Sequence, residues 1–185
     1  MTAPDLPTSE TATQRSRGSL LALSLGIALL IIVLDQASKW IILTDVMVPP
    51  RVIEVLPIFN LVLTFNYGVS FGLFSGEAQW QPFMLSALAV VISIGLCAWL
   101  ARQPSRHLAI AVGLIVGGAI GNVIDRLRLD AVVDFLDFHW GDWHWPAFNI
   151  ADTAITLGVV SILVVDILFG GGTKPKLDAR KEEER

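Results

Sequence analysis

The segment GGAIGNVIDRLRLDAVVDFLDFHWGDWHWPAFNIAD (residues 117–152) joins two apolar runs through a region rich in carboxylates and amides. Its aspartates Asp125, Asp134 and Asp152 flank segments that are apolar enough to span a membrane. Ionisable groups in such places are energetically costly and usually serve a function. We therefore expect the rest of the chain to hold these polar groups at one depth in a bilayer.

The composition of the whole chain indicates a membrane protein of one domain. Of its 185 residues, 54% are hydrophobic and only 16% are charged, whereas a soluble domain carries about 25% charged residues. The net charge of -4 says little about partners, because the distribution of the charges matters more than their sum. Cys97 is the single cysteine, so an internal disulfide or a paired-cysteine site is excluded.

Four apolar segments are long enough to cross a bilayer as helices. Their predicted ranges are 19–43, 82–101, 107–124 and 153–169. The first follows Arg15 and Arg17, but no small-residue cleavage site closes it, so we interpret it as a helix and not as a signal peptide. Gly113, Gly117 and Gly121 in the third recur every four residues, which predicts close approach of a neighbouring helix.

Basic residues predict the orientation of these spans. The N-terminal flank, the connection between the second and third spans, and the C-terminal flank carry Arg or Lys, so we expect all three to be cytoplasmic. Arg126 and Arg128 run against this bias, and one of them is expected to have a local acidic partner. The predicted divisions are a disordered tail (1–18), a membrane domain (19–169) with outer loops 44–81 and 127–151, and a second tail (170–185).

The first outer loop predicts a small β-structure. The runs V-I-E-V-L (52–56) and F-N-L-V-L-T-F-N (59–66) alternate in polarity and are separated by a proline, which is typical of a hairpin. The glycines of N-Y-G-V-S-F-G-L-F (66–74) then permit tight backbone approach. Five tryptophans on the predicted outer side are ordinary for a membrane interface: Trp40, Trp80, Trp140, Trp143 and Trp145.

Two groups of polar residues lie at helical spacing within the first and third spans. Asp35 and Lys39 are four residues apart and can pair on one helix face. Asn122, Asp125 and Arg126 also share a face, and Arg126 offers Asp125 a ready partner. For both groups, a purely structural role is as well supported by the spacing as a role in substrate binding.

Asp134 and Asp152 differ from these, because neither has a basic residue within one helical turn. Both lie beside apolar residues, so two carboxylates brought together there are expected to share one proton. Such a pair can serve as acid and base toward a water and hydrolyse an amide without a metal or a covalent intermediate. A structural role as a helix N-cap is open for Asp152. Spacing alone leaves open whether Asp125 or Asp134 pairs with it.

The histidines do not complete another kind of active site. His107, His139 and His144 have no nucleophile at a suitable spacing, and the zinc motif H-E-x-x-H is absent. We interpret them as interfacial residues. Neither a metal nor another cofactor is expected.

Five blocks of the chain resemble those of the bacterial lipoprotein signal peptidases, also called signal peptidase II. In order they are D-Q-A-S-K (35–39), N-Y-G-V-S-F (66–71), G-N-V-I-D-R (121–126), V-V-D-F (132–135) and F-N-I-A-D (148–152). The resemblance implies an aspartyl endopeptidase of the bacterial cytoplasmic membrane with its active site near the outer leaflet. Such an enzyme removes the signal peptide of a prolipoprotein just before the diacylglyceryl-modified cysteine.

The resemblance also implies the roles of residues, the fold and the partners. Asp134 and Asp152 match the catalytic pair. The supporting polar residues match Asp35, Lys39, Asn66, Asn122, Asp125, Arg126 and Asn149. We expect an α-helical polytopic membrane protein with four transmembrane helices, a small extracytoplasmic β-sheet and a short outer helix that shelters the site. The expected partners are lipid-modified prolipoprotein precursors, membrane lipids and the inhibitory cyclic peptide globomycin, with no nucleic acid, and the chain is expected to be a monomer.

Other functions make different demands on the sequence. A proton- or ion-coupled carrier needs acids spread across the membrane depth, whereas only Asp166 lies far from the predicted outer cluster. A presenilin-like intramembrane aspartyl protease carries a G-x-G-D signature, which is missing here. A non-catalytic lipid-binding or chaperone-type protein would leave a lipidated precursor intact, so proteolysis separates it from the enzyme.

Overall fold

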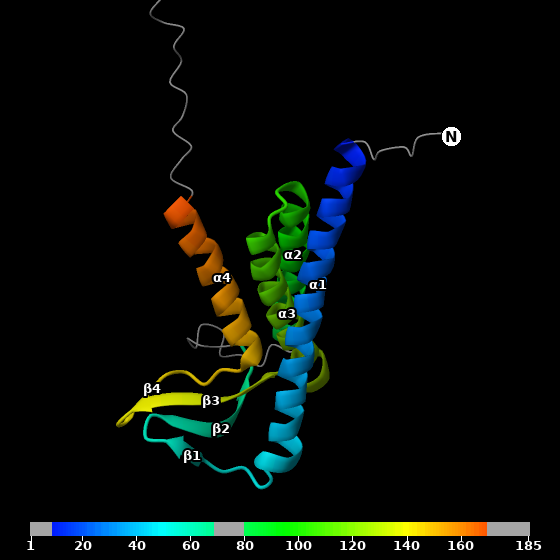
Figure 1. Ribbon diagram of the computed structural model, residues 1–185. Coiled ribbons are helices and arrows are strands. Elements are labelled where there is room, and N and C mark those ends of the chain that lie inside the picture. The colour runs from blue at the N-terminus through cyan, green and yellow to red at the C-terminus, as the bar shows by residue number, and fades with distance from the viewer. Residues whose placement is uncertain (1–8, 69–79, 170–185) are drawn as a thin grey trace, which may run out of the picture.

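The computed structural model describes residues 9–68 and 80–169, and long helices make up most of this part of the chain (Figure 1). These are α1 (Ser9–Ile41), continued by the π-helical turn η1 (Ile42–Val46), α2 (Gln81–Arg102), α3 (Arg106–Leu129) and α4 (Ile150–Phe169). Each of the four α-helices contains a stretch long and apolar enough to cross a bilayer. The predicted polytopic membrane fold with four spans is confirmed.

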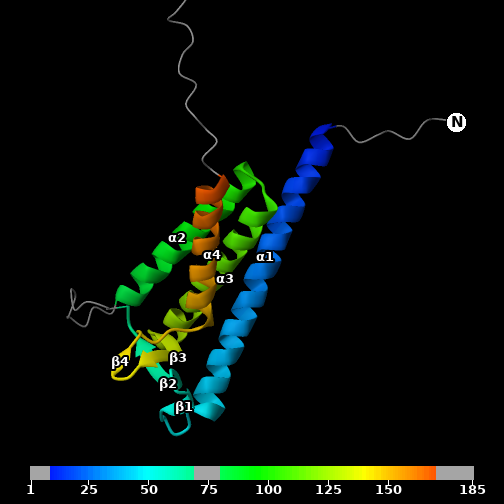
Figure 2. The same cartoon turned by 60° about the vertical axis from the view of Figure 1, so that its left-hand side comes forward.

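The central helix of the bundle is α3. Of its most apolar stretch 67% is buried, against 17% in each of the other three helices. The reason is that α1, α2 and α4 all pack on α3 (Figure 2). An apolar core joins α1, α2 and α3, and its buried members are Ala28, Leu100, Leu108, Ala109, Val112 and Val116.

Two glycines of α3 set its distance from α1. A Cβ atom at Gly113 would lie 2.7 Å from the backbone oxygen of Ser24, and one at Gly117 would lie 2.7 Å from that of Ala28. Carbon and oxygen do not tolerate such distances, so any side chain at either position would push α1 away. The close helix approach predicted from the glycine spacing is confirmed, and α1 is the neighbour.

A four-stranded antiparallel sheet lies across one end of the bundle (Figure 1). Its strands, in spatial order, are β1 (Ile53–Leu56), β2 (Phe59–Asn66), β3 (Val132–Trp140) and β4 (Trp143–His144). The hairpin predicted in the first outer loop is confirmed as β1 and β2. By contrast, β3 was not predicted as a strand, because residues 132–135 are buried on both faces and therefore show no alternation. Its pairing with β2 joins the two outer loops into one layer.

A second apolar cluster fixes this sheet to the helices. Ile42 and Met47, at the end of the first span, pack with Phe135 of β3, and all three are buried. Partly buried residues of β1 and β2, among them Ile53 and Leu61, pack around them. The sheet is therefore attached to the bundle by a small core of its own.

Two helix ends differ from the predicted positions. α3 continues to Leu129 and does not end at residue 124, because Asp125, which suggested a boundary, is buried and paired inside the bundle. It ends where Asp130 adopts a left-handed backbone with a φ of 57°. α1 begins at Ser9, before the predicted start at residue 19. Residues 1–8 and 170–185 of the predicted tails lie outside the described residues.

The start of α1 and the end of α4 both lie at the end of the bundle opposite the sheet (Figure 1). An even number of spans requires this arrangement. In the described parts of the two outer loops, the short outer helix implied by the resemblance is not a separate element. Residues 69–79, which include the end of the N-Y-G-V-S-F block, lie outside the described residues.

Candidate active site

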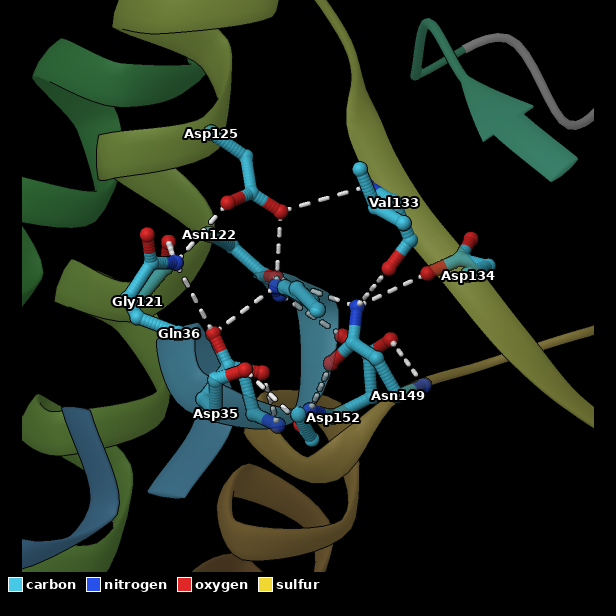
Figure 3. Close-up of polar contacts among 12 residues, drawn as sticks. Asp35, Gln36, Gly121, Asn122, Asp125, Val133, Asp134, Asn149 and Asp152 are labelled. Carbon is cyan, nitrogen blue, oxygen red and sulfur yellow. Dashed lines mark hydrogen bonds and ion pairs between the residues drawn. The ribbon is translucent and has the colours of Figure 1, made fainter. Parts of the chain in front are cut away.

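The predicted site residues meet where the sheet joins the helices (Figure 3). Hydrogen bonds and ion pairs connect all of them except Arg126 into one network. Those that are at most 6% exposed are Asp35, Lys39, Asn122, Asp125, Asp134 and Asn149. The others, Asn66, Arg126 and Asp152, are half-buried. Segments as much as 116 residues apart in the sequence, such as those of Asp35 and Ala151, therefore build one polar cluster.

Lys39 of α1 is the cation of this cluster. Its Nζ lies 2.8 Å from Asp35 Oδ2 and 2.7 Å from Asp125 Oδ2. It also donates a hydrogen bond of 3.0 Å to Asn122 Oδ1. All three donors of the ammonium group are thereby used, and two buried carboxylates are held by one buried cation.

Asp125 was expected to pair with Arg126, and this prediction is wrong. Asp125 faces α1, where Lys39 and Gln36 contact it, and its Oδ2 also accepts from the backbone nitrogen of Val133 at 3.2 Å. Arg126 lies on the next position around α3 and lines a pocket instead. The acidic partner predicted for Arg126 or Arg128 is absent from the described ion pairs, since Arg128 bonds the amide oxygen of Gln36 at 3.4 Å.

The start of α4 is a reciprocal capping arrangement. Asn149 is the N-cap, and its Oδ1 accepts from the backbone nitrogen of Asp152 at 2.9 Å. Asp152 Oδ2 in turn accepts from the backbone nitrogen of Asn149 at 3.3 Å. Asp35 Oδ1 accepts from the backbone nitrogen of Ala151 at 3.0 Å, a further donor of the first turn. These three caps begin the helix at Ile150, before the predicted residue 153.

The capping role occupies one oxygen of Asp152 and leaves the other for the cluster. Asp152 Oδ1 accepts a hydrogen bond of 2.8 Å from Asn122 Nδ2. The N-cap is therefore Asn149 and not Asp152 as considered from the sequence, and the supporting role of Asp152 in the cap accounts for one of its two oxygens.

Asn149 connects the two carboxylates proposed from the sequence as a pair. Its Nδ2 donates to Asp134 Oδ1 at 2.7 Å, and its backbone nitrogen donates to Asp152 Oδ2 at 3.3 Å. In the described part of the chain no direct hydrogen bond joins Asp134 to Asp152. The two share one site across an amide, whereas Asp125 belongs to the Lys39 side.

The surroundings of Asp134 favour its protonated form. The side chain is 2% exposed, and its Oδ2 accepts from Asn66 Nδ2 at 3.0 Å. Asn66 lies opposite Val132 in the β2–β3 ladder, which makes it a diagonal neighbour of Asp134. Burial raises the pKa of Asp134 to about 6; the hydrogen bonds from Asn66 and Asn149 oppose this shift, and the charge of Asp152 adds to it.

Each carboxylate of the pair faces a pocket of its own. Asp152 lines a pocket of about 310 Å³ with Asn122 and Arg126, between α2, α3 and α4. Asp134 lines another of about 450 Å³ with Asn66 and Tyr67, beside the sheet. The two carboxylates are therefore open to different pockets, one on the helix side and one beside the sheet.

Sequence reasoning missed the role of Gln36 and a second polar cluster on the sheet. Gln36 lies three residues before Lys39, so the helical spacing that placed Lys39 also pointed to it. His144, interpreted as interfacial, has its Nδ1 2.9 Å from both oxygens of Asp137. Burial alone would raise the pKa of Asp137, but hydrogen bonds from His144 and Asn60 hold it below its ordinary value.

Comparison with known proteins places this geometry among membrane proteases. A family model described as Signal peptidase (SPase) II matches residues 27–169. A lipoprotein signal peptidase of Acinetobacter baumannii is 44% identical over 154 residues, which are 82% of this chain and 86% of that protein. One of Burkholderia thailandensis is 43% identical over 155 residues, covering 83% and 92%. A solved structure of a bacterial membrane enzyme at 2.3 Å resolution has a TM-score of 0.68 at 30% identity and covers 83% and 92% of the two chains.

Proposed function

This chain belongs to the signal peptidase II family and is a protease, and we propose that Asp134 and Asp152 are its catalytic pair. The substrates are prolipoproteins, and the bond that is cut lies just before the diacylglyceryl-modified cysteine. The observation that carries this proposal is a contrast in charge. Asp35 and Asp125 are held by Lys39, whereas Asp134 and Asp152 have amide partners and no ion pair among the described residues.

The environments of the two carboxylates favour different roles. Asp134 is buried and has a raised pKa, so it serves as the acid, and the half-buried Asp152 serves as the base. Asp152 takes a proton from a water as the water attacks the scissile carbonyl carbon, and Asp134 donates its proton to the carbonyl oxygen. When the C–N bond breaks, Asp152 passes its proton to the leaving nitrogen and Asp134 regains one from the hydroxyl.

The two asparagines orient the pair. Asn122 Nδ2 donates to Asp152 and Asn149 Nδ2 donates to Asp134, so both amides are engaged with the carboxylates and not with a substrate oxygen. Each carboxylate is therefore held in position before substrate binds, and preorganised dipoles of this kind do not have to rearrange during the reaction. A bound lipidated peptide would exclude water from Asp134 and raise its pKa further, which favours the acid role.

The proposed location is the bacterial cytoplasmic membrane, with the sheet and the catalytic pair on the outer side. Arg102 and Arg106 lie at the turn between α2 and α3, opposite the sheet (Figure 1). The positive-inside bias makes that end cytoplasmic, together with both termini. A lipid-modified precursor remains in the outer leaflet, so its scissile bond lies at the depth of the pair. The enzyme works as a monomer among membrane lipids and is inhibited by globomycin.

The carrier alternative has no support in the comparisons or in the structure. A path for protons or ions needs ionisable groups at successive depths. The buried carboxylates of the described residues all lie at the sheet end of the bundle: Asp35, Asp125, Asp134 and Asp137.

The test is cleavage of a lipid-modified precursor by purified full-length protein in proteoliposomes. Asp134→Asn and Asp152→Asn should each lower kcat at least about 100-fold, because each removes a proton-transfer group. Asp142→Asn is the same change on an exposed turn residue of the sheet and should cleave like the wild type. Globomycin should inhibit the wild type and Asp142→Asn alike. Ordinary cleavage by a well-folded Asp134→Asn or Asp152→Asn protein rules out the catalytic pair.

A further inference from the structure

A further pocket, apart from those of Asp134 and Asp152, lies at the end of the bundle opposite the sheet. It has a volume of about 480 Å³ and is formed by the end of α2, the start of α3 and the end of α4. Its lining includes Trp99, Gln103, His107, Leu108, Ile162 and Asp166. The pocket beside Asp152 is formed by the same three helices, so both pockets lie between α2, α3 and α4, one toward each end of the bundle.

Helical spacing places the linings of the two pockets on the same faces of α2 and α4, as the two ends of one groove would be. On α4, Ile155 lines the pocket beside Asp152, and Ile162 lines the pocket at the opposite end. On α2, Ile92 and Trp99 do the same. Both pairs are seven residues apart, which is close to two full helical turns and returns to the same face. Since α2 and α4 both pack on α3, α3 forms the floor of this groove and the other two helices form its walls.

The far end of the groove carries a negative charge beside an aromatic ring. Asp166 is the one acidic residue that lines the pocket opposite the sheet; it is exposed and has no hydrogen bond or ion pair to any other described residue. Trp99, in the same lining, is 37% exposed. Arg102 and Arg106 do not line this pocket. A pocket lined by a carboxylate and a partly exposed aromatic ring is suited to an ammonium or guanidinium group.

The length of the groove matches that of a signal peptide. Asp152 and Asp166 are 14 residues apart on α4, which corresponds to about 21 Å at about 1.5 Å per residue. A signal peptide has an apolar segment of about 7–15 residues that follows a positively charged segment, and as a helix this apolar segment is about 10–22 Å long. With its scissile bond at Asp152, such a peptide would place its basic residues near Asp166.

We propose that the pocket formed by Trp99 and Asp166 binds the basic N-terminal segment of the signal peptide, while the apolar segment lies in the groove between α2 and α4. This inference rests on the proposed function, because it requires a signal peptide as substrate. Asp166 is then a residue that selects and positions substrate. It lies at the opposite end of α4 from the catalytic pair and does not take part in the chemistry.

The test compares two lipid-modified precursors that differ only in the charge of the N-terminal segment, one with lysines and one with glutamines. With the lysine precursor, Asp166→Asn should raise KM about two- to fivefold and leave kcat unchanged, since an exposed ion pair contributes little. With the glutamine precursor, Asp166→Asn and wild type should have the same KM. Asp142→Asn is the matched control and should behave like wild type with both precursors.

Charge reversal provides an independent arm. Asp166→Lys should cleave a precursor with glutamates in the N-terminal segment at a lower KM than the wild type does. An equal effect of Asp166→Asn on both precursors, as a structural role or a lipid headgroup in the pocket would give, overturns the inference, and so does no effect on either. If wild-type protein leaves both precursors intact, the proposed function fails. If it cleaves them without discriminating charge, this inference alone fails.

Discussion

Two pairs of carboxylates lie within one cluster, and they differ in their partners: one pair contacts a cation and the other contacts amides. Asp35 and Asp125 share the ammonium of Lys39, whose nitrogen lies within 2.8 Å of both. Asp134 and Asp152 are linked through Asn149 and have no ion pair in the described part of the chain. The first pair joins α1 to α3 and caps α4, so we assign it to the architecture.

The difference teaches which carboxylates are free to exchange protons. A buried carboxylate beside a cation is stabilised in its charged form by that cation. A buried carboxylate held by amides can gain or lose a proton at modest free-energy cost. The amide donors stabilise its charged form, but no neighbouring cation has to lose its ion pair when the carboxylate is protonated. Variants that exchange these two situations therefore test the assignment, and their expected effects range from loss of the fold to a small shift in pH dependence.

Lys39→Met should have the largest effect. It leaves Asp35 and Asp125 buried without a cation, which should lower the free energy of unfolding by about 3–5 kcal/mol in detergent micelles. Replacing both carboxylates as well, in Lys39→Met with Asp35→Asn and Asp125→Asn, should recover much of this loss, because no charge is then left unpaired. An unchanged unfolding free energy in Lys39→Met would show that the cluster does not depend on this cation.

The pH dependence of stability should separate Asp134 from the Lys39 side. The pKa of Asp134 is raised above its unfolded value to about 6, so its favourable contribution is complete below about pH 4 and is lost as pH rises through about 6. This loss amounts to about 3 kcal/mol for a shift of this size. Asp134→Asn should remove this dependence from denaturation curves recorded between pH 4 and 8. The same slope in the variant would assign the dependence to another group.

Asn149 contributes both to the helix cap and to the catalytic pair, and two substitutions separate these roles. Asn149→Ala removes the cap and should lower the free energy of unfolding by about 1–2 kcal/mol, with loss of cleavage. Asn149→Ser keeps a good N-cap but is too short to reach Asp134, so stability should stay near wild type while kcat falls. Unfolding and cleavage measured on the same preparations compare the two. Equal kcat in wild type and Asn149→Ser would contradict the bridging role.

Asn66→Ala should have the smallest effect. Removing this donor from the Asp134 carboxylate should raise the pKa of Asp134 further, because the hydrogen bond from Asn66 lowers it. The pH profile of kcat should move toward higher pH, with less than about a tenfold change in rate. Asn60→Ala is the matched control on the same strand, since Asn60 bonds Asp137 and not Asp134. Identical profiles for Asn66→Ala and wild type would contradict the proposed coupling.

The sequence was sufficient for the spans and the glycine contact, because these depend on local spacing, whereas most members of the polar cluster came from the family resemblance. Gly113 and Gly117 specify a close helix pair by their interval alone, and the motifs around Asp134 and Asp152 carried the family resemblance. The partners across space were not predictable in the same way. Lys39 and Arg126 are both plausible cations for Asp125, and only the packing of α1 on α3 selects Lys39.

The strand β3 was not predicted, for a related reason. Its first four residues are all buried, so the alternation that reveals a surface strand is missing. The 68-residue separation between Asn66 and Asp134 is likewise closed by the β2–β3 pairing. The sequence contains both residues but not the register that brings them together.

Infrared spectroscopy of the protein in lipid, between pH 4.5 and 8, can determine which buried carboxyl carries the exchangeable proton. We predict one carboxylic C=O band that disappears as pH rises through about 6, in line with the raised pKa of Asp134. This band should be absent in Asp134→Asn, move to lower pH in Asp152→Asn and persist in Asp125→Asn. A band that survives in Asp134→Asn, or that vanishes in Asp125→Asn, would contradict the assignment of the exchangeable proton to Asp134.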